Sequence, residues 1–213
     1  MPRQVDHESR RRRIAEAVCG LADERGLEGV TLRDVADRAQ VSMGAVQRCF
    51  RSKEEMLRFA VGHIGERITE RVRTRLNASP AQSAATALGY AATEIALLHR
   101  DHRAEARVWL AFVAQAAVSA PLATTLRTGY AALQDLFARL IAEAAESDPP
   151  GDGGSAPVDP HREARALLAL ADGLTTHVLI GHLTAENAAD VLDAHLTSLW
   201  ERLGEGSREA DGG

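Results

Sequence analysis

The sequence predicts an all-α protein in which short N-terminal helices precede a larger helical body. Apolar residues recur with a helical period along most of the 213 residues, and no alternating pattern typical of a strand competes with it. Alanine and leucine dominate the apolar residues, whereas aromatic residues make up only 4% of the chain, which favours helix over sheet. Serine and threonine also stand where short helices would begin between residues 31 and 53.

The first helix is expected to end near Arg25, because Gly26 can adopt the left-handed conformation that closes a helix. An arginine run, residues 10–13, precedes the apolar face of this helix. The run forms either a solvated tail or a flexible arm that contacts phosphates or the minor groove of DNA. The apolar face consists of Ile14, Ala17, Val18, Leu21 and Ala22.

Two short helices joined by a tight turn follow. Thr31, with Asp34 three positions later, can cap the first helix. Ser42 can cap the second, which we expect to run as far as Phe50. Residues 52–55, Ser-Lys-Glu-Glu, form a further capping box for a long helix. This arrangement is typical of a helix-turn-helix, so we predict a DNA-binding domain.

The second short helix is the predicted recognition helix. Gly44 and Ala45 keep its start slim enough to enter the major groove, which is about 12 Å wide. Gln47 could bind adenine, and Arg48 could bind guanine or a phosphate, although ordinary exposed polar residues would give the same pattern. The residues expected to contact DNA are Thr31, Arg33, Ser42, Met43, Gly44, Ala45, Gln47, Arg48 and Lys53.

This stretch resembles the DNA-binding region of TetR-family repressors. The resemblance rests on Val30–Ala36, Val41–Ser42 with Gly44, Phe50 and Ser52–Leu57. Gln47 and Cys49 depart from it, since the family prefers aromatic residues there, and the phosphate contact credited to the aromatic side chain is not implied for this chain. Residues 105–112, Glu-Ala-Arg-Val-Trp-Leu-Ala-Phe, look like the subgroup that includes the betaine-pathway repressor.

The body is predicted to contain further helices, whose apolar stripes place them at 53–77, 81–99, 103–119, 122–146, 161–182 and 185–203. Residues 147–160 are rich in Pro, Gly and Asp and should form a mobile loop. We therefore expect three parts: a helix-turn-helix domain at residues 1–52, a helical effector-binding and dimerisation domain at 53–203, and a flexible tail at 204–213.

The charge distribution favours a basic DNA-binding domain, here called the reading head, followed by an acidic body. Chance segregation of surface charge is the alternative. Residues 1–75 hold 16 Lys and Arg against 12 Asp and Glu, although the whole chain has a net charge of -5. Cys19 and Cys49 have no CxxC spacing, so we expect no disulfide or structural zinc and a reducing cytoplasm. The sequence shows no secretory signal, membrane span, metal-ligand spacing or cofactor motif.

The resemblance also implies an effector pocket and a dimer interface in the body. The candidate pocket residues are Tyr90, His99, Trp109, Phe112, Tyr130 and His177, although aromatic residues at helical spacing are more often core. In the family the last two helices pair with those of a second subunit. The candidate interface residues are Leu167, Leu170, Leu174, Val178, Leu192, Leu196 and Leu199, with packing inside one chain as the alternative.

We predict a homodimeric repressor that binds a palindromic operator and is released by a small-molecule effector, with the long helix after Lys53 as transmitter. Activation is equally compatible with DNA binding alone. The rival interpretation is a helical small-molecule-binding protein or enzyme without DNA binding, but no GxSxG or glycine-rich phosphate loop supports catalysis. A third interpretation is a membrane-associated or scaffold helical protein, but no basic amphipathic helix of suitable hydrophobicity appears in the sequence. Cys49 is interpreted as a packing residue in preference to a redox switch.

Overall fold

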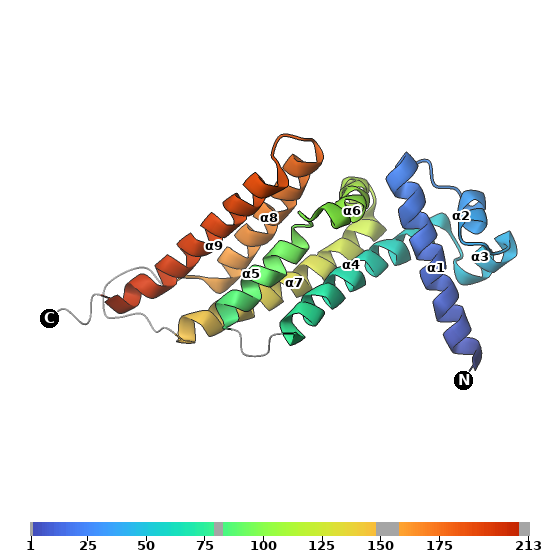
Figure 1. Cartoon of the computed structure of the whole chain (residues 1–213). Helices are drawn as coiled ribbons and strands as arrows, with labels where there is room; N and C mark the ends of the chain where they lie inside the picture. The colour runs from blue at the N-terminus through green and yellow to red at the C-terminus, as the bar shows by residue number, and fades with distance from the viewer. Residues whose placement is uncertain (1, 79–82, 148–157, 209–213) are drawn as a thin grey trace. The chain divides into compact units, whose positions relative to one another are not determined.

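The computed structural model describes residues 2–78, 83–147 and 158–208 and confirms the all-α fold class. Within these ranges the chain forms nine α-helices, one short 3-10 helix and no strand (Figure 1). The elements are α1 (Pro2–Arg25), α2 (Leu32–Arg38), α3 (Met43–Cys49), α4 (Lys53–Asn77), α5 (Ala84–Ile95), η1 (Arg100–His102), α6 (Arg103–Ala116), α7 (Ala120–Ser147), α8 (Pro160–Leu179) and α9 (Ala185–Arg208).

The first of two compact units comprises Met1–Arg67 and Asp101–Gly129. It therefore joins α1, α2, α3 and the start of α4 to α6 and the start of α7. α1 packs against α2, α3 and α6. Fully buried side chains such as Ile14, Val46 and Ile64 form the core of this unit, and each contributes roughly 1.5–3 kcal/mol.

The second unit comprises Ile68–Arg100 and Tyr130–Gly213. α8 packs on α9, and α5 contacts both helices. The hydroxyl of buried Thr175 on α8 donates to the Ala96 carbonyl at 2.6 Å, which gives the C-terminal end of α5 a partner. The largest core side chains are Leu88, Phe137, Ile141, Leu167, Leu192 and Leu199.

Two predicted helix ends are wrong. α1 begins at Pro2, so the arginine run lies inside a helix instead of in a tail or flexible arm. Arginine is a good helix former, and an ion pair of 3.5 Å between Arg12 and Glu8, one turn apart, supports the helix. At the other end, α9 continues to Arg208, so the first part of the predicted flexible tail is helical.

Apart from those of α5, the other predicted helix boundaries lie within three residues of the observed ones. α4 covers Lys53–Asn77 as predicted, and Gly26 closes α1 with a φ of 71°. α5 is shorter than expected and ends at Ile95, before Leu97 with a φ of 50°. The predicted mobile loop lies mostly outside the described residues, as does the end of the predicted tail. No described helix combines the length and the apolar character that spanning a bilayer requires.

Candidate nucleic-acid interface

Side-chain caps fix the start of α2 and of α3. The Oγ1 atom of Thr31 accepts a hydrogen bond from the Asp34 amide at 3.2 Å, and the Oγ atom of Ser42 accepts one from the Ala45 amide at 3.2 Å. A cap of this kind stabilises a helix by about 1 kcal/mol. Between the helices Gln40 adopts a φ of 53°, which turns the chain toward α3. Both predicted N-caps are confirmed.

α3 has one buried and one exposed face. Val46 and Phe50 are buried, as predicted, together with Cys49. Ala45 is also buried, with only 7% of its surface exposed, so the expectation that it faces outward is wrong. Its position one helical turn before Cys49 places it on the packing side. The exposed side carries Ser42, Met43, Gln47 and Arg48, with Gly44 half-buried among them.

The two capping hydroxyls differ in what they can offer to DNA. Thr31 donates its hydroxyl hydrogen to the Oδ2 atom of Asp34 at 2.7 Å while its oxygen caps α2. Ser42 caps α3 through its acceptor capacity alone, which leaves its hydrogen for a phosphate oxygen. Ser42 is therefore better suited than Thr31 to a phosphate contact.

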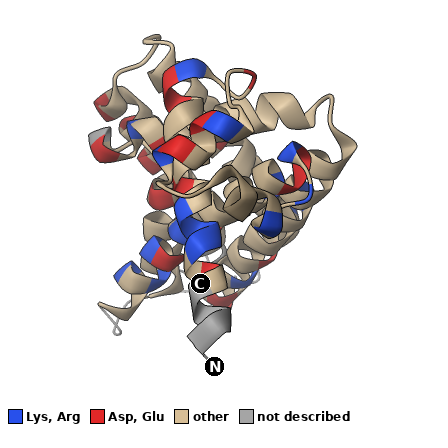
Figure 2. Ribbon diagram, turned by 90° about the vertical axis from the view of Figure 1, so that its right-hand side faces the viewer, with Lys and Arg blue, Asp and Glu red and all other residues tan. Residues whose placement is uncertain are grey.

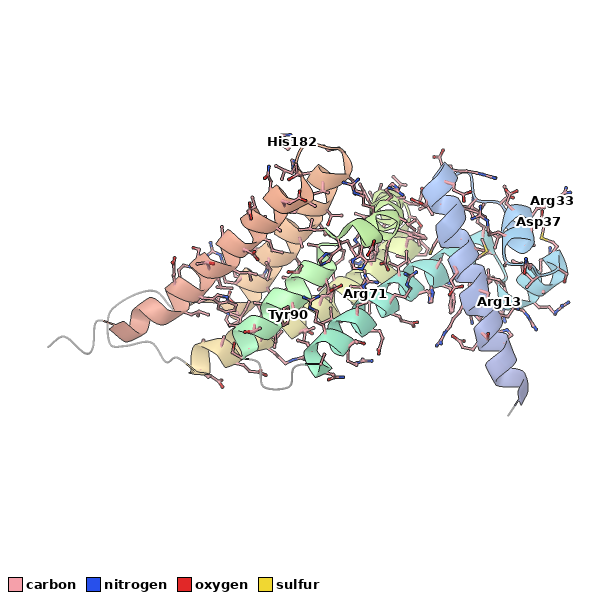
Figure 3. All side chains as sticks on the ribbon, viewed as in Figure 1. Arg13, Arg33, Asp37, Arg71, Tyr90 and His182 are labelled. Atoms are coloured by element: carbon pink, nitrogen blue, oxygen red, sulfur yellow. The ribbon has the colours of Figure 1, made fainter. Side chains whose placement is uncertain are left out.

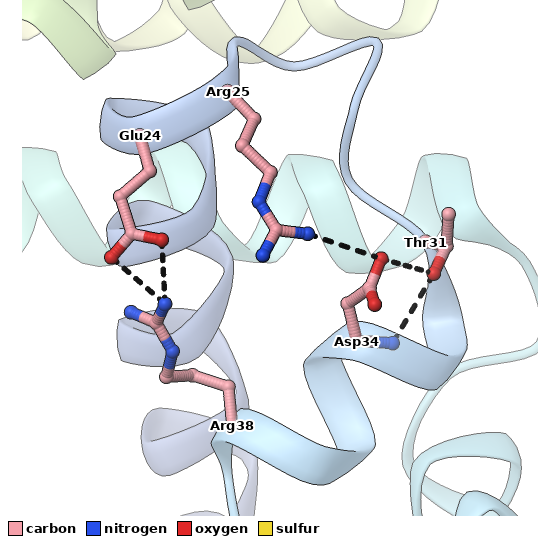
Figure 4. Close-up of polar contacts among 5 residues, drawn as sticks. All are labelled: Glu24, Arg25, Thr31, Asp34 and Arg38. Atoms are coloured by element: carbon pink, nitrogen blue, oxygen red, sulfur yellow. Dashed lines mark hydrogen bonds and ion pairs between the residues drawn. The ribbon is translucent and has the colours of Figure 1, made fainter.

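Two ion pairs join α1 to α2 in the DNA-binding domain (Figure 4). The Nη2 atom of Arg38 donates to both carboxylate oxygens of Glu24, at 2.8 and 2.7 Å. This hydrogen bond holds the pKa of Glu24 below its ordinary value. Arg25 lies 3.8 Å from the Oδ2 atom of Asp34. These two arginines hold α1 against α2.

Three cations among the predicted DNA contacts lack an ion pair within the described residues. Arg33, Arg48 and Lys53 form no ion pair with any residue that the structure describes. Arg33 and Arg48 are exposed, and Figure 3 shows Arg33 pointing away from the helices, with Asp37 beside it on α2. Unpaired cations of this kind can neutralise DNA phosphates.

Lys53 stands at the start of α4, where Ser52 caps the helix as predicted but the return bond of the capping box goes to the Arg51 amide instead of the Ser52 amide. The Oγ atom of Ser52 accepts from the Glu55 amide at 3.0 Å, and the Glu55 carboxylate accepts from the Arg51 amide at 2.8 Å. The carboxylates of Glu54 and Glu55 lie in the first turn of α4. They oppose an anion there, so a phosphate would be held by the Lys53 ammonium more than by the helix terminus.

The arginine run presents part of its charge to solvent. Figure 2 shows basic residues forming a band on α1. Arg12 and Arg13 are exposed, whereas Arg11 is half-buried. The run thus contributes at least two exposed cations to the surface of the first unit.

The candidate effector residues of the second unit have individual partners. The hydroxyl of Tyr130 donates to the Oδ2 atom of Asp172 at 2.5 Å. The guanidinium of Arg75 lies 4.7 Å from the centre of the Tyr90 ring, and His99 is exposed. The ring of His177 lies 4.9 Å from that of His182.

The remaining candidates, Trp109 and Phe112, lie on α6 in the first unit. Phe112 is fully buried, so it serves the core, and Trp109 is half-buried. The assignment of all six residues to an effector pocket stays a prediction.

Sequence reasoning missed a buried carboxylate in the second unit. Glu94 is 6% exposed and pairs with Arg71 at 3.3 Å and with Arg75 at 3.6 Å. Figure 3 labels Arg71, which is one of the two arginines that pair with Glu94. A single glutamate inside an apolar run was the available signal, because such a residue is seldom buried without cationic partners.

Six of the seven candidate interface residues are buried within the chain's own core; these are Leu167, Leu174, Val178, Leu192, Leu196 and Leu199. Leu170 is half-buried and borders a shallow hollow of about 290 Å³ on α8 and α9. Gly173, His177 and Val191 also line this hollow. A second subunit could therefore meet the hollow and its rim; of the six buried residues, Leu174 lines the hollow.

A second hollow, of about 220 Å³, lies within the first unit and is lined by residues of α1, α4 and α6. Burial raises the pKa of Cys19, on its wall, to about 12, so this thiol is protonated and unreactive at neutral pH. Beside it, the Nε atom of Arg107 on α6 donates to Asp23 on α1 at 2.6 Å. Arg67 and Glu105 form a looser pair at 3.9 Å. The described residues contain no cluster of three or more potential metal ligands.

Comparison with known proteins matches both parts of the chain. Residues 14–59 match the tetR family of bacterial regulatory proteins, and residues 84–201 match the C-terminal domain of BetI-type transcriptional repressors. The transcriptional regulator PksA of Bacillus subtilis is 32% identical over 183 residues, which cover 84% of this chain and 83% of that protein. The regulator BetI of Burkholderia thailandensis is 31% identical over 179 residues, covering 82% of this chain and 84% of that protein.

Solved structures share the fold over most of their length. A transcriptional regulator of Rhodococcus sp. Rha1, 27% identical, superposes with a TM-score of 0.76 over 90% of this chain and 96% of its own. A transcriptional regulator of Saccharomonospora viridis, solved in complex with choline, gives a TM-score of 0.76 at 23% identity over 89% of this chain and 96% of its own. At that identity the second likeness concerns the fold alone.

Proposed function

Because the chain belongs to the TetR family of bacterial transcriptional regulators, we propose that it is a homodimeric repressor that leaves a palindromic operator when a small-molecule effector binds. It is a DNA-binding regulator and not an enzyme, since its relatives along most of the chain are regulators. Residues 1–52 read DNA, and residues 53–203 bind the effector and a second copy. The protein acts in the cytoplasm, where its DNA lies.

The exposed face of α3 is the observation that carries this proposal. Gln47 and Arg48 offer side chains that suit base edges and phosphates, and Ser42 offers a free hydroxyl hydrogen. A Cβ atom at Gly44 would meet only the tip of the Arg48 side chain, at 3.4 Å. The packing of the protein does not demand a glycine there, so its advantage is the room that it leaves for the DNA backbone.

A second copy of the chain is the proposed occupant of the hollow on α8 and α9. Val191 is 43% exposed on its wall, and Ile180, at the turn after α8, is 69% exposed. Covering these apolar side chains is favourable, at about 25 cal/mol for each Å² removed from water. A two-fold dimer would present one α3 to each half of a palindrome.

The proposed response to the effector is a shift between two conformations of the reading heads. An effector can cause such a shift only through different affinities for the two states. α4 and α7 each begin in one compact unit and end in the other, so they are the continuous elements through which the body acts on the head. α6 belongs to the head's unit, where Arg107 ties it to Asp23 of α1.

A footprinting experiment on the DNA upstream of the protein's own gene tests the proposal. We expect protection of two half-sites related by a two-fold axis, and one dimer bound to each site. Binding to one isolated half-site as tightly as to the full site would contradict the dimeric mode. A thermal-shift screen of small molecules, followed by release of the footprint, would identify the effector.

A further inference from the structure

Arg11 differs from its neighbours in the arginine run because its guanidinium lies over two aromatic rings. The Cζ atom of Arg11 lies 4.8 Å from the centre of the Phe50 ring and 4.3 Å from that of Phe59. The two rings lie 5.4 Å apart and are tilted by 55°. The Nε atom of Arg11 is buried and has no hydrogen-bond partner in the described part of the chain. Ring faces therefore hold this cation.

The two rings belong to the segment that joins the recognition helix to the long helix. Phe50 is the C-cap of α3, and its amide donates to the Val46 carbonyl at 2.9 Å. Phe59 lies on α4, two turns after that helix begins. Arg11 on α1 thus contacts the residue that ends α3 and a residue that fixes α4.

We propose that Arg11 is a positioning residue, which sets the angle of the recognition helix by clamping α1 onto Phe50 and Phe59 and does not itself touch DNA. The inference rests on the proposed DNA-binding function. A guanidinium that lies over two rings gains cation–π attraction, and its planar shape suits stacking, whereas an ammonium lacks that shape. Arg13, which is exposed, is left for a phosphate, whereas Arg12 is exposed but pairs with Glu8.

The salt dependence of operator binding separates positioning from phosphate contact. Each phosphate contact that is lost lowers the slope of log K against log salt by about 0.9. We expect Arg11→Gln to weaken operator binding about tenfold, as loss of a desolvated cation–π pair implies, with an unchanged slope. The matched control, Arg13→Gln, should weaken binding and lower the slope by about 0.9.

A conservative variant gives the second readout. Arg11→Lys keeps the positive charge but loses the flat stacking surface, so we expect its operator affinity to be as low as that of Arg11→Gln. Phe59→Leu should have the same effect, and combining it with Arg11→Gln should weaken binding little further, because both changes remove one contact. Binding is compared well below the midpoint of thermal unfolding of each variant.

Several results would overturn the proposal. Full affinity of Arg11→Lys together with a lowered slope of Arg11→Gln would show a phosphate contact instead. Unchanged operator affinity of Arg11→Gln would show that the clamp has no role in DNA binding. If Arg11→Gln does not fold, wild-type affinity of Phe59→Leu would be equally decisive. Absence of operator binding by the wild-type protein in the same titration would instead refute the proposed function itself.

Discussion

Arg48 and Arg38 lie close together in sequence but have different environments. Arg38 donates to both carboxylate oxygens of Glu24, whereas Arg48 is exposed and forms no ion pair with a described residue. Only a cation without a carboxylate partner can neutralise a phosphate or bind a base at little cost. The two arginines therefore form a matched pair of sites for mutation.

We predict that Arg48→Ala weakens operator binding by about 1–3 kcal/mol if Arg48 binds a base, and lowers the salt slope by about 1 if it binds a phosphate. Fluorescence anisotropy on a labelled operator at several salt concentrations measures both quantities. Arg38→Ala is the control and should leave the slope unchanged. If wild type and Arg48→Ala have equal affinity and equal salt slopes, Arg48 does not contact the operator.

Cys19 gives a prediction about pH. Its folded-state pKa is raised to about 12 by burial, so the unfolded chain loses the thiol proton first as pH rises. The stability contributed by the neutral thiol is complete below the unfolded pKa, about 8.5, and is lost as pH rises toward 12. Urea unfolding at pH 8 and pH 10.5 should show a smaller loss of stability for Cys19→Ala than for wild type. An equal loss in both proteins would contradict the assignment.

Local sequence predicted the residues whose partners lie within one helical turn. The caps at Thr31 and Ser42 were predictable because a capping residue bonds an amide three positions later. The burial of Ala45 was not, since a small residue marks neither face of a short helix. The place of Arg11 over two rings was equally hidden, because charge runs usually face solvent.

Among the helices, α6 is the one whose compact unit the sequence did not reveal. Its apolar stripe predicted a helix of the body, but its residues cluster with α1 in the first compact unit. Arg107 and Asp23, which join the two helices, are separated by 84 positions, and no local pattern connects them. By contrast, α4 was predicted with correct ends because a capping box and a regular apolar period define it.

The ion pair between α1 and α6 should contribute modestly to stability. The side chains of Arg107 and Asp23 are 49% and 24% exposed, so solvent screens their attraction. A double-mutant cycle with Arg107→Ala and Asp23→Ala should give a coupling of roughly 0.2–1 kcal/mol that decreases with added salt. The exposed pair of Arg73 and Glu70 is a suitable reference. A coupling that does not respond to salt would show a buried contact instead.

For the whole molecule, recognition of a palindromic operator depends on assembly into a two-fold dimer. The apolar stripes of α8 and α9 led to the prediction of a dimer interface on these helices. Most of the leucines predicted to form that interface instead fill the chain's own core. Sequence periodicity identifies which residues are buried, and it does not distinguish burial in one chain from burial between two. The exposed wall residues of the hollow are the better candidates.

Val191→Glu is therefore predicted to convert the dimer into a monomer, because it places a charge on the covered apolar wall. Val118→Glu is the matched control, since Val118 is 82% exposed at the turn between α6 and α7. Sedimentation velocity at micromolar concentration measures the mass of both variants. A dimeric Val191→Glu variant, or a monomeric wild type, would refute the proposed interface.

DNA binding by this protein is tested most simply by the affinity of the purified protein for the DNA upstream of its own gene, measured at several salt concentrations. We predict tight binding at low salt that falls steeply as salt rises and that favours a palindromic site over a scrambled sequence of equal length. Absence of binding at low salt, or equal affinity for the palindrome and the scrambled DNA, would show that the protein is not a regulator that recognises a palindromic operator.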